Sequence, residues 1–169
     1  MTALRVLVTI AAALVLQTTL ARFLVRGAGG VDLVLVAVVY LGLTSGPTAG
    51  ILSGTIAGLA QDSLGSGIVG VGGLAKTVVG YLAGRIGTTF IVSQTIPRFL
   101  VFFGATLVQV GLTTGLYYLL DPQPPVVTLY AALGESLANA LLGVVFFQVL
   151  DALPGMIDRR RGMSRGRVR

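Results

Sequence analysis

The stretch that decides the fold runs from residue 46 to residue 62 and reads GPTAGILSGTIAGLAQD. Four glycines recur in it at a strict spacing of four, namely Gly46, Gly50, Gly54 and Gly58. Residues four apart share one side of an α-helix, so the run predicts a helix face without side chains. Because a helical glycine costs about 1 kcal/mol relative to alanine, this strip indicates close packing against another backbone, as between small residues of membrane helices.

The composition is that of an integral membrane protein. Hydrophobic residues make up 54% of the 169 residues, charged residues make up 11%, and the mean hydropathy is +0.92. Such a chain has too few polar side chains to cover a water-exposed surface. A cleaved signal peptide is the competing interpretation of the N-terminal apolar run. No convincing small-residue cleavage site precedes Arg22, so we expect this segment to stay as a helix.

The residue types present exclude most familiar catalytic sites. The chain has no cysteine and no histidine, which excludes disulfides, thiolate nucleophiles, imidazole bases and zinc sites built from these residues. We therefore expect no enzymatic activity, no metal and no cofactor. The net charge is +6, and six arginines lie among the last eleven residues. Directly after an apolar segment, this pattern is typical of a cytoplasmic membrane flank and not of a nucleic-acid site.

Apolar runs, charges and prolines predict six helices, which form one transmembrane domain over residues 1–155 with a basic cytoplasmic tail over residues 156–169. The six lie near residues 4–24, 32–46, 47–61, 68–90, 98–120 and 127–152. Residues 33–61 would be about 43 Å long as one helix and about 21 Å each as two, against a bilayer core of about 30 Å. Pro47 after Gly46 disfavours a continuous helix, so we predict two short helices in a tight hairpin.

The distribution of positive charge allows two topologies. With six spans, both termini are cytoplasmic, together with Arg5, Arg85 and Arg98, whereas Arg22 and Arg26 lie outside. A five-span alternative places Arg22 and Arg26 inside and only Arg5 outside, and charge alone slightly favours it. Helix length favours six. We therefore predict a compact all-α bundle of six transmembrane helices, with five as the alternative.

Two ionisable residues lie inside predicted spans. Lys76 follows Ile68 by eight residues and Glu135 follows Val127 by eight, so each lies about 12 Å inward from the same outer side. Charges within a membrane usually face the bundle interior and pair, which makes an ion pair between Lys76 and Glu135 our hypothesis. The alternative is that Lys76 extends to an interface while Glu135 lines a watery crevice or caps a kink.

The remaining polar residues and glycines receive structural interpretations. Asp32 and Asp62 are placed at outer edges of predicted helices, Asp32 as a helix N-cap and Asp62 as a solvated interfacial charge. A second glycine strip surrounds Lys76, and its members are Gly72, Gly80 and Gly84. Both strips predict faces that either pack on each other, which we favour, or receive a partner helix. Interhelical hydrogen bonds are predicted for the amides of Gln17, Gln109, Asn139 and Gln148.

Several motifs, taken in order, carry a likeness to a known family. They are LQTTL at residues 16–20, VDL at 31–33, GxxxGxxxGLAQD at 50–62 and LAKxxxGYLxG at 74–84. In this order the chain resembles the rod shape-determining protein MreD family, over most of its length up to about Arg85. Val31 departs from the pattern, because such proteins often have a proline before the aspartate.

The resemblance implies a non-enzymatic scaffold subunit of the bacterial cell-elongation complex, which lies in the inner membrane with a cytoplasmic C-terminus and supports lateral peptidoglycan synthesis and rod shape. The implied partners are an MreC-like protein with one membrane helix, the RodA glycosyltransferase with its transpeptidase, and the MreB filament. The family is thought to share a six-helix fold with substrate-capture subunits of energy-coupling-factor transporters. Capture of a vitamin or another small solute is therefore the alternative function.

Overall fold

The computed structural model describes residues 3–24, 30–65, 67–90, 94–121 and 126–165; side chains are described from residue 8 to residue 19 in the first helix and up to residue 150 in the last. Within these ranges the chain forms six α-helices and no strand, which confirms the predicted all-helical class. The helices are α1 (Ala3–Leu24), α2 (Leu33–Ser45), α3 (Pro47–Leu64), α4 (Val71–Thr89), α5 (Thr95–Leu120) and α6 (Leu129–Arg165).

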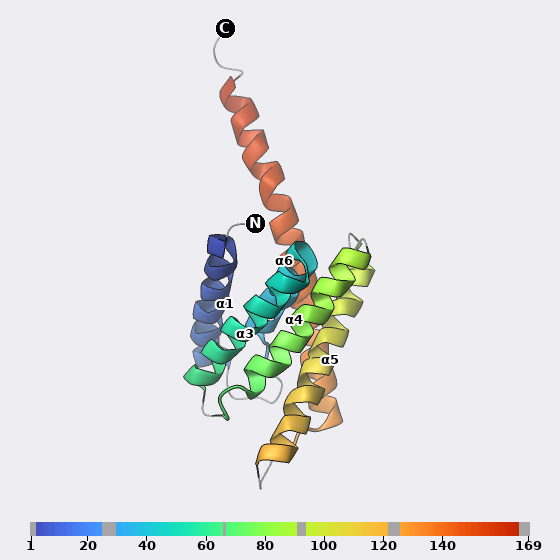
Figure 1. Ribbon diagram of the computed structural model, residues 1–169. Helices are drawn as coiled ribbons and strands as arrows, with labels where there is room; N and C mark the ends of the chain where they lie inside the picture. Colours follow the sequence, from blue (N-terminus) through green and yellow to red (C-terminus); the bar gives the residue numbers. More distant parts are fainter. Residues whose placement is uncertain (1–2, 25–29, 66, 91–93, 122–125, 166–169) are drawn as a thin grey trace.

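Successive helices run in alternating directions (Figure 1). The start of α1 and the end of α6 lie at one end of the bundle, which we call the tail end; α2 and α4 begin at the opposite end, the cap end. Helix α6 has 37 residues and is about 55 Å long, so its C-terminal part projects beyond the other helices. The predicted boundary at residue 156 is therefore not a helix end, because the backbone stays helical to Arg165.

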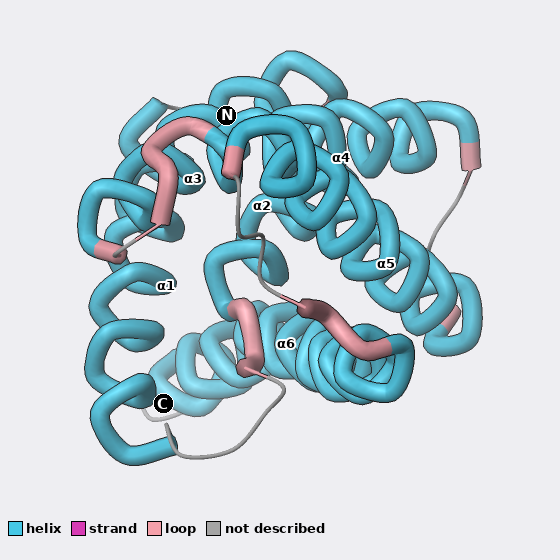
Figure 2. The backbone as a smooth tube through the Cα atoms, turned by 90° about the horizontal axis from the view of Figure 1, so that it is seen from below, coloured by secondary structure: helices cyan, strands magenta, loops and turns pink. Residues whose placement is uncertain are grey.

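Helix α2 forms the centre of the bundle. Figure 2 shows it enclosed by the other five helices, and it contacts each of them. Its sequence, LVLVAVVYLGLTS, is apolar on every face, and eight of its 13 residues are buried. A helix that is hydrophobic all round is stable only where it is surrounded. At 13 residues it is about 20 Å long, which is shorter than a bilayer core.

The predicted break between the second and third helices is confirmed. Helix α2 ends at Ser45, Pro47 is the first residue of α3, and Gly46 between them has a φ of +90°. Proline suits the first helical position and glycine suits a positive φ. A Cβ added at Gly46 would meet only the Thr88 methyl group, at 3.8 Å. Gly46 is thus required for its backbone conformation and, unlike the rest of its strip, has open space where a Cβ would lie.

The two glycine strips face each other across α3 and α4. Gly50 lies against the backbone of Gly80, and Gly54 lies against the backbone of Lys76. A Cβ added at Gly58 would lie only 2.5 Å from the Gly73 Cα. These pairs follow one antiparallel register. Each successive glycine along α3 lies against a residue about one turn earlier in α4. The strips therefore pack on each other within the bundle, which is the alternative that we favoured over binding of a partner helix.

The ends of the second strip have different neighbours. A Cβ added at Gly84 would lie 2.7 Å from the Gly46 carbonyl carbon, where the α2–α3 hairpin passes over α4. One added at Gly72 would meet the carboxylate of Asp62. Gly84 therefore extends the close contact to the hairpin, whereas Gly72 makes room for a side chain.

The outside of the bundle is rich in large apolar side chains. Exposed Leu, Ile, Val, Tyr and Phe residues occur on α1 and on each of α3 to α6. Two described segments are long and apolar enough to cross a membrane, Thr95–Leu120 of α5 and Leu129–Leu150 of α6. Contiguous apolar surface on this scale indicates contact with lipid or with other membrane helices.

Candidate functional site

A cluster of buried and half-buried polar side chains, which we call the polar centre, surrounds the first turn of α2. Its members come from five elements and are Gln17, Asp32, Lys76, Gln109 and Asn139. The first N–H groups of an α-helix have no partner within the helix. At a buried helix start they need acceptors from elsewhere, because water cannot supply them.

Asp32 is the N-cap of α2, as predicted. Its Oδ1 accepts from the Leu35 N–H at 2.9 Å. The Asp32 N–H in turn donates to Asn139 Oδ1 of α6 at 2.9 Å. Asp32 is only 6% exposed and Asn139 is fully buried. The start of α2 is thus held by Asp32 and by Asn139 of α6, which is distant in the sequence.

Gln17 of α1 completes the capping of α2. Its Oε1 accepts from Leu33 N–H at 2.6 Å and from Val34 N–H at 3.3 Å. Its Nε2 donates to the Val31 carbonyl at 3.2 Å. When the bonds of Asp32 are included, every backbone N–H of residues 32–35 has a side-chain acceptor. Helix α1, which also packs on α2 and α3 through Ile10, is therefore fixed to α2 by a specific polar contact.

A buried ion pair lies beside this cap. Lys76 Nζ lies 2.8 Å from Asp32 Oδ2, and the two side chains are 4% and 8% exposed. Gln109 Nε2 of α5 also donates to Asp32 Oδ2, at 3.1 Å. A buried charge needs both a partner and hydrogen bonds, and Asp32 has both. Lys76 on α4, itself packed against Gly54 of α3, is thereby tied to α2 and α5.

The hypothesis of a Lys76–Glu135 pair is corrected by this geometry, because the partner of Lys76 is Asp32. Glu135 is half-buried on α6, and among the described residues it forms no ion pair. Counting residues from the outer ends correctly put Lys76 inside the bundle. Asp32, predicted at an outer edge because it opens the second predicted helix, is instead buried, because the short α2 begins within the bundle.

Asp62, predicted as a solvated charge, instead caps α4. Its Oδ2 accepts from the Gly70 N–H at 2.9 Å and from the Gly73 N–H at 3.0 Å. Gly70 has a φ of +104° and precedes the first residue of α4. A carboxylate at a helix N-terminus is stabilised by the free N–H groups and by the helix dipole. Asp62 therefore joins the end of α3 to the start of α4.

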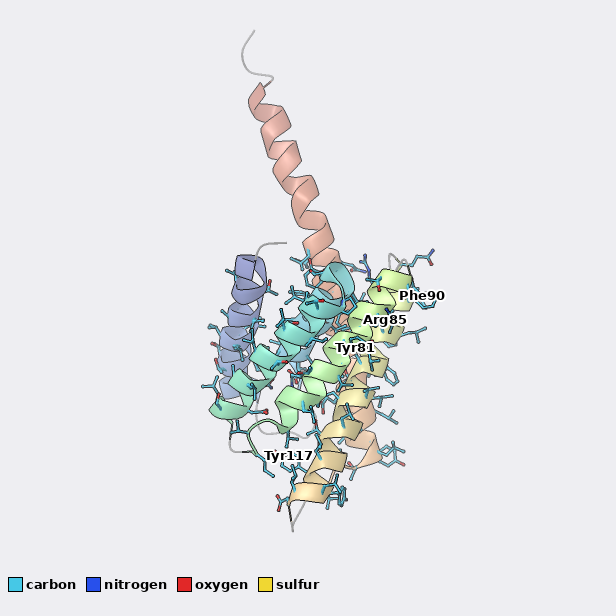
Figure 3. All side chains as sticks on the ribbon, viewed as in Figure 1. Tyr81, Arg85, Phe90 and Tyr117 are labelled. Atoms are coloured by element: carbon cyan, nitrogen blue, oxygen red, sulfur yellow. The ribbon has the colours of Figure 1, made fainter. Side chains whose placement is uncertain are left out.

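Other polar residues divide between the interior and the surface. The predicted interhelical bonds of Gln17, Gln109 and Asn139 are observed, whereas Gln148 is exposed. At the tail end, the Arg98 guanidinium carbon lies 4.4 Å from the centre of the Phe147 ring, a cation–π contact between α5 and α6. Arg85 is exposed near the same end of α4, as Figure 3 shows.

A wide apolar groove, which we call the α1–α6 groove, opens between α1 and α6 with α2 as its floor. Its volume is about 460 Å³, and the residues that line it include Ala12, Leu16, Val36, Leu142, Val145 and Phe146. Within the described ranges α1 and α6 do not pack on each other. The groove is thus a place where the bundle is incompletely closed.

The apolar exterior, the central buried helix and the polar centre define a helical membrane protein whose described polar residues join helices together. The chain matches the rod shape-determining protein MreD over residues 1–153, and it belongs to that family. The family resemblance expected from the motifs is confirmed. No curated protein and no solved structure gives a significant match. Family membership supports a role in the determination of rod shape and places the chain in a family of structural proteins.

Proposed function

We propose that the chain is a multi-pass scaffold subunit of the bacterial cell-elongation complex, which supports lateral peptidoglycan synthesis without catalysing it. The observation that carries this proposal is the family match over residues 1–153. The packing supports it, because the buried charges and amides serve to cap and join helices. A rigid bundle of this kind can hold other membrane proteins in position.

The topology that we propose has six spans, with both termini in the cytoplasm. The alternating helix directions support an even number of crossings (Figure 1). Arg85 and Arg98 lie towards the tail end of α4 and α5, and the arginines of the α6 extension continue from that end. Positive charge on one side is typical of the cytoplasmic side. The tail end is therefore the cytoplasmic end in this proposal.

Chemical labelling tests this topology. The natural chain has no cysteine, so any thiol labelling of the chain comes from a single cysteine added at the N-terminus. The proposal expects no reaction of intact cells with a membrane-impermeant thiol reagent, and reaction after the membrane is opened. Labelling from outside would establish the five-span alternative.

The partner that we propose is the single membrane helix of an MreC-like protein, bound in the α1–α6 groove. The glycine strips of α3 and α4 are occupied by each other, so they are not free to receive it. A helix is about 10 Å wide, and the groove offers two apolar walls and an apolar floor along α2. RodA with its transpeptidase, and the MreB filament, would join through or beside this partner, and the lipid bilayer would surround the bundle.

Purification from membranes tests the scaffold function. The full chain, captured gently from a rod-shaped bacterium, is expected to bring down an MreC-like protein in a fixed ratio, identified by mass. A vitamin present in stoichiometric amounts, with no such protein, would support the transporter alternative. The α1–α6 groove is lined mainly by apolar side chains, whereas solute capture needs convergent polar groups.

A further inference from the structure

Three buried polar atoms near the polar centre have no hydrogen-bond partner in the described protein. They are Gln109 Oε1 and Thr113 Oγ1 of α5 and Asn139 Nδ2 of α6. Gln109 is 8% exposed and Asn139 is fully buried. Buried polar atoms are almost always bonded, to protein or to ordered water. Three such atoms on two neighbouring helices indicate a bonding partner that is not part of the chain.

The orientation of both amides is fixed by Asp32. Asn139 must present its oxygen to the Asp32 N–H, so its Nδ2 donor points elsewhere. Gln109 must present its nitrogen to the Asp32 carboxylate, so its Oε1 acceptor points elsewhere. Turning either amide over would set donor against donor or acceptor against acceptor. The free donor and the free acceptor are therefore consequences of the Asp32 contacts.

Two of these atoms lie close to Asp32. Both amides bond to atoms of this single residue through one end, so the free end of each amide lies near it. Thr113 lies one helical turn beyond Gln109 and on the same face of α5. Glu135, half-buried, lies one turn before Asn139 on α6. Polar groups from α5 and α6 thus continue from the ion pair towards the cap end.

We propose that this position is a binding site for ordered water, held between Gln109, Thr113 and Asn139. The ligand must accept from Asn139 Nδ2 and donate to Gln109 Oε1, so it is a neutral molecule that does both. A cation would be repelled by the amide donor and an anion by the amide oxygen. Buried water typically makes about three hydrogen bonds, which matches the three free atoms.

The water has a structural consequence for the ion pair. Gln109 and Asn139 each use one end of the amide to hold Asp32, and water bound to the other end fixes the amide's orientation. The Asp32 carboxylate then keeps its bonds to Gln109 and to Leu35 while it faces Lys76. Ordered water thus stabilises the start of α2 without touching α2.

Solid-state NMR of the full chain in lipid vesicles tests the proposal directly. Asn139 is the only asparagine of the chain, so it gives a single asparagine side-chain amide signal, which its carbon correlations separate from the glutamine amides. When magnetisation starts on water, we expect this signal to build up much faster than the backbone amide of Val38, which is fully buried in the same bundle. Equal, slow build-up at the two positions would overturn the proposal.

A matched pair of variants gives an independent readout. Thr113→Val removes only the free hydroxyl, and Thr114→Val makes the same change at the next residue of α5. If water bonds to Thr113, its loss is expected to lower the midpoint of thermal unfolding by about 2–4 °C relative to the Thr114 variant. An unchanged or raised midpoint would show that the Thr113 hydroxyl has no partner and would contradict its place in the site.

Discussion

Lys76 Nζ and Asp32 Oδ2 lie 2.8 Å apart at the centre of the bundle, and this ion pair joins the fourth helix to the start of the second. The lysine backbone is in close contact with Gly54, so the same residue takes part in both the glycine packing and the polar centre. A change at either contact is therefore expected to affect the position of α4.

Asp32→Asn removes the charge that faces Lys76 and keeps an oxygen to cap Leu35. Breaking a buried ion pair in this way costs about 3–5 kcal/mol, and we expect a loss of that size in the free energy of unfolding. Circular dichroism of the purified chain in detergent measures it. Adding Lys76→Met to the first change removes the unpaired charge and should recover most of the loss.

Glu135→Gln is the control that tests whether Lys76 depends on Asp32 and not on Glu135. Glu135 is half-buried and forms no ion pair with Lys76, so we expect a change below about 1 kcal/mol. A loss as large as that of Asp32→Asn would mean that Lys76 depends equally on Glu135, contrary to the observed geometry.

Gly54→Ala places a methyl group against the backbone of Lys76 and Thr77, with the Thr77 Cα 2.8 Å from the new carbon. Backbone cannot move aside as a flexible side chain can, so α3 and α4 must separate. Overpacking of this kind costs about 1–3 kcal/mol, and Gly54→Leu is expected to cost more. Thermal unfolding followed by circular dichroism is the measurement.

Gly111→Ala is the matched control for the glycine packing. It lies in the interior of α5, where an added Cβ meets nothing within 4 Å. Alanine is the better helix former by about 1 kcal/mol, so this variant should be as stable as the natural chain or more so. Equal losses at Gly54 and Gly111 would show that the α3–α4 contact does not explain the effect.

The break between α2 and α3 shows what the sequence could predict. A glycine followed by proline ends a helix for local reasons, namely a positive φ and a missing N–H, so the hairpin was predicted correctly. The partner of Lys76 could not be predicted in the same way, because it depends on how deep α2 begins. That depth is set by the other five helices around a 13-residue segment, and hydropathy along the chain does not encode it.

Gly46→Ala tests the hairpin separately from the packing. At a φ of +90° and a ψ of 179°, a conformation that is essentially restricted to glycine, an alanine is strained by about 1–3 kcal/mol, although the space beside it is open. Gly104→Ala on α5 also enters open space but without a positive φ, and it should cost nothing. The difference between the two unfolding free energies is the strain plus the gain in helix propensity at Gly104, which is about 1 kcal/mol. No difference would contradict the assigned role of Gly46.

Asp62→Ala is expected to loosen the start of α4. Loss of a capping side chain costs about 0.5–2 kcal/mol, and the effect should be local. Hydrogen exchange followed by mass spectrometry should show faster exchange over residues 67–75, with α5 unchanged. Asp62→Asn, which keeps an acceptor oxygen, should exchange more like the natural chain. Unaltered exchange in the alanine variant would argue against the cap.

Disulfide crosslinking shows whether the partner helix lies in the α1–α6 groove. Single cysteines replace Ala12 and Leu142, which line opposite walls of the α1–α6 groove, and Val108 on α5 as the control. Each variant is expressed with an MreC-like partner that carries one cysteine in its membrane helix, and the membranes are oxidised. The account predicts crosslinked heterodimers from positions 12 and 142 and none from position 108. Crosslinks from position 108 alone would place the partner on α5 and contradict the proposed groove.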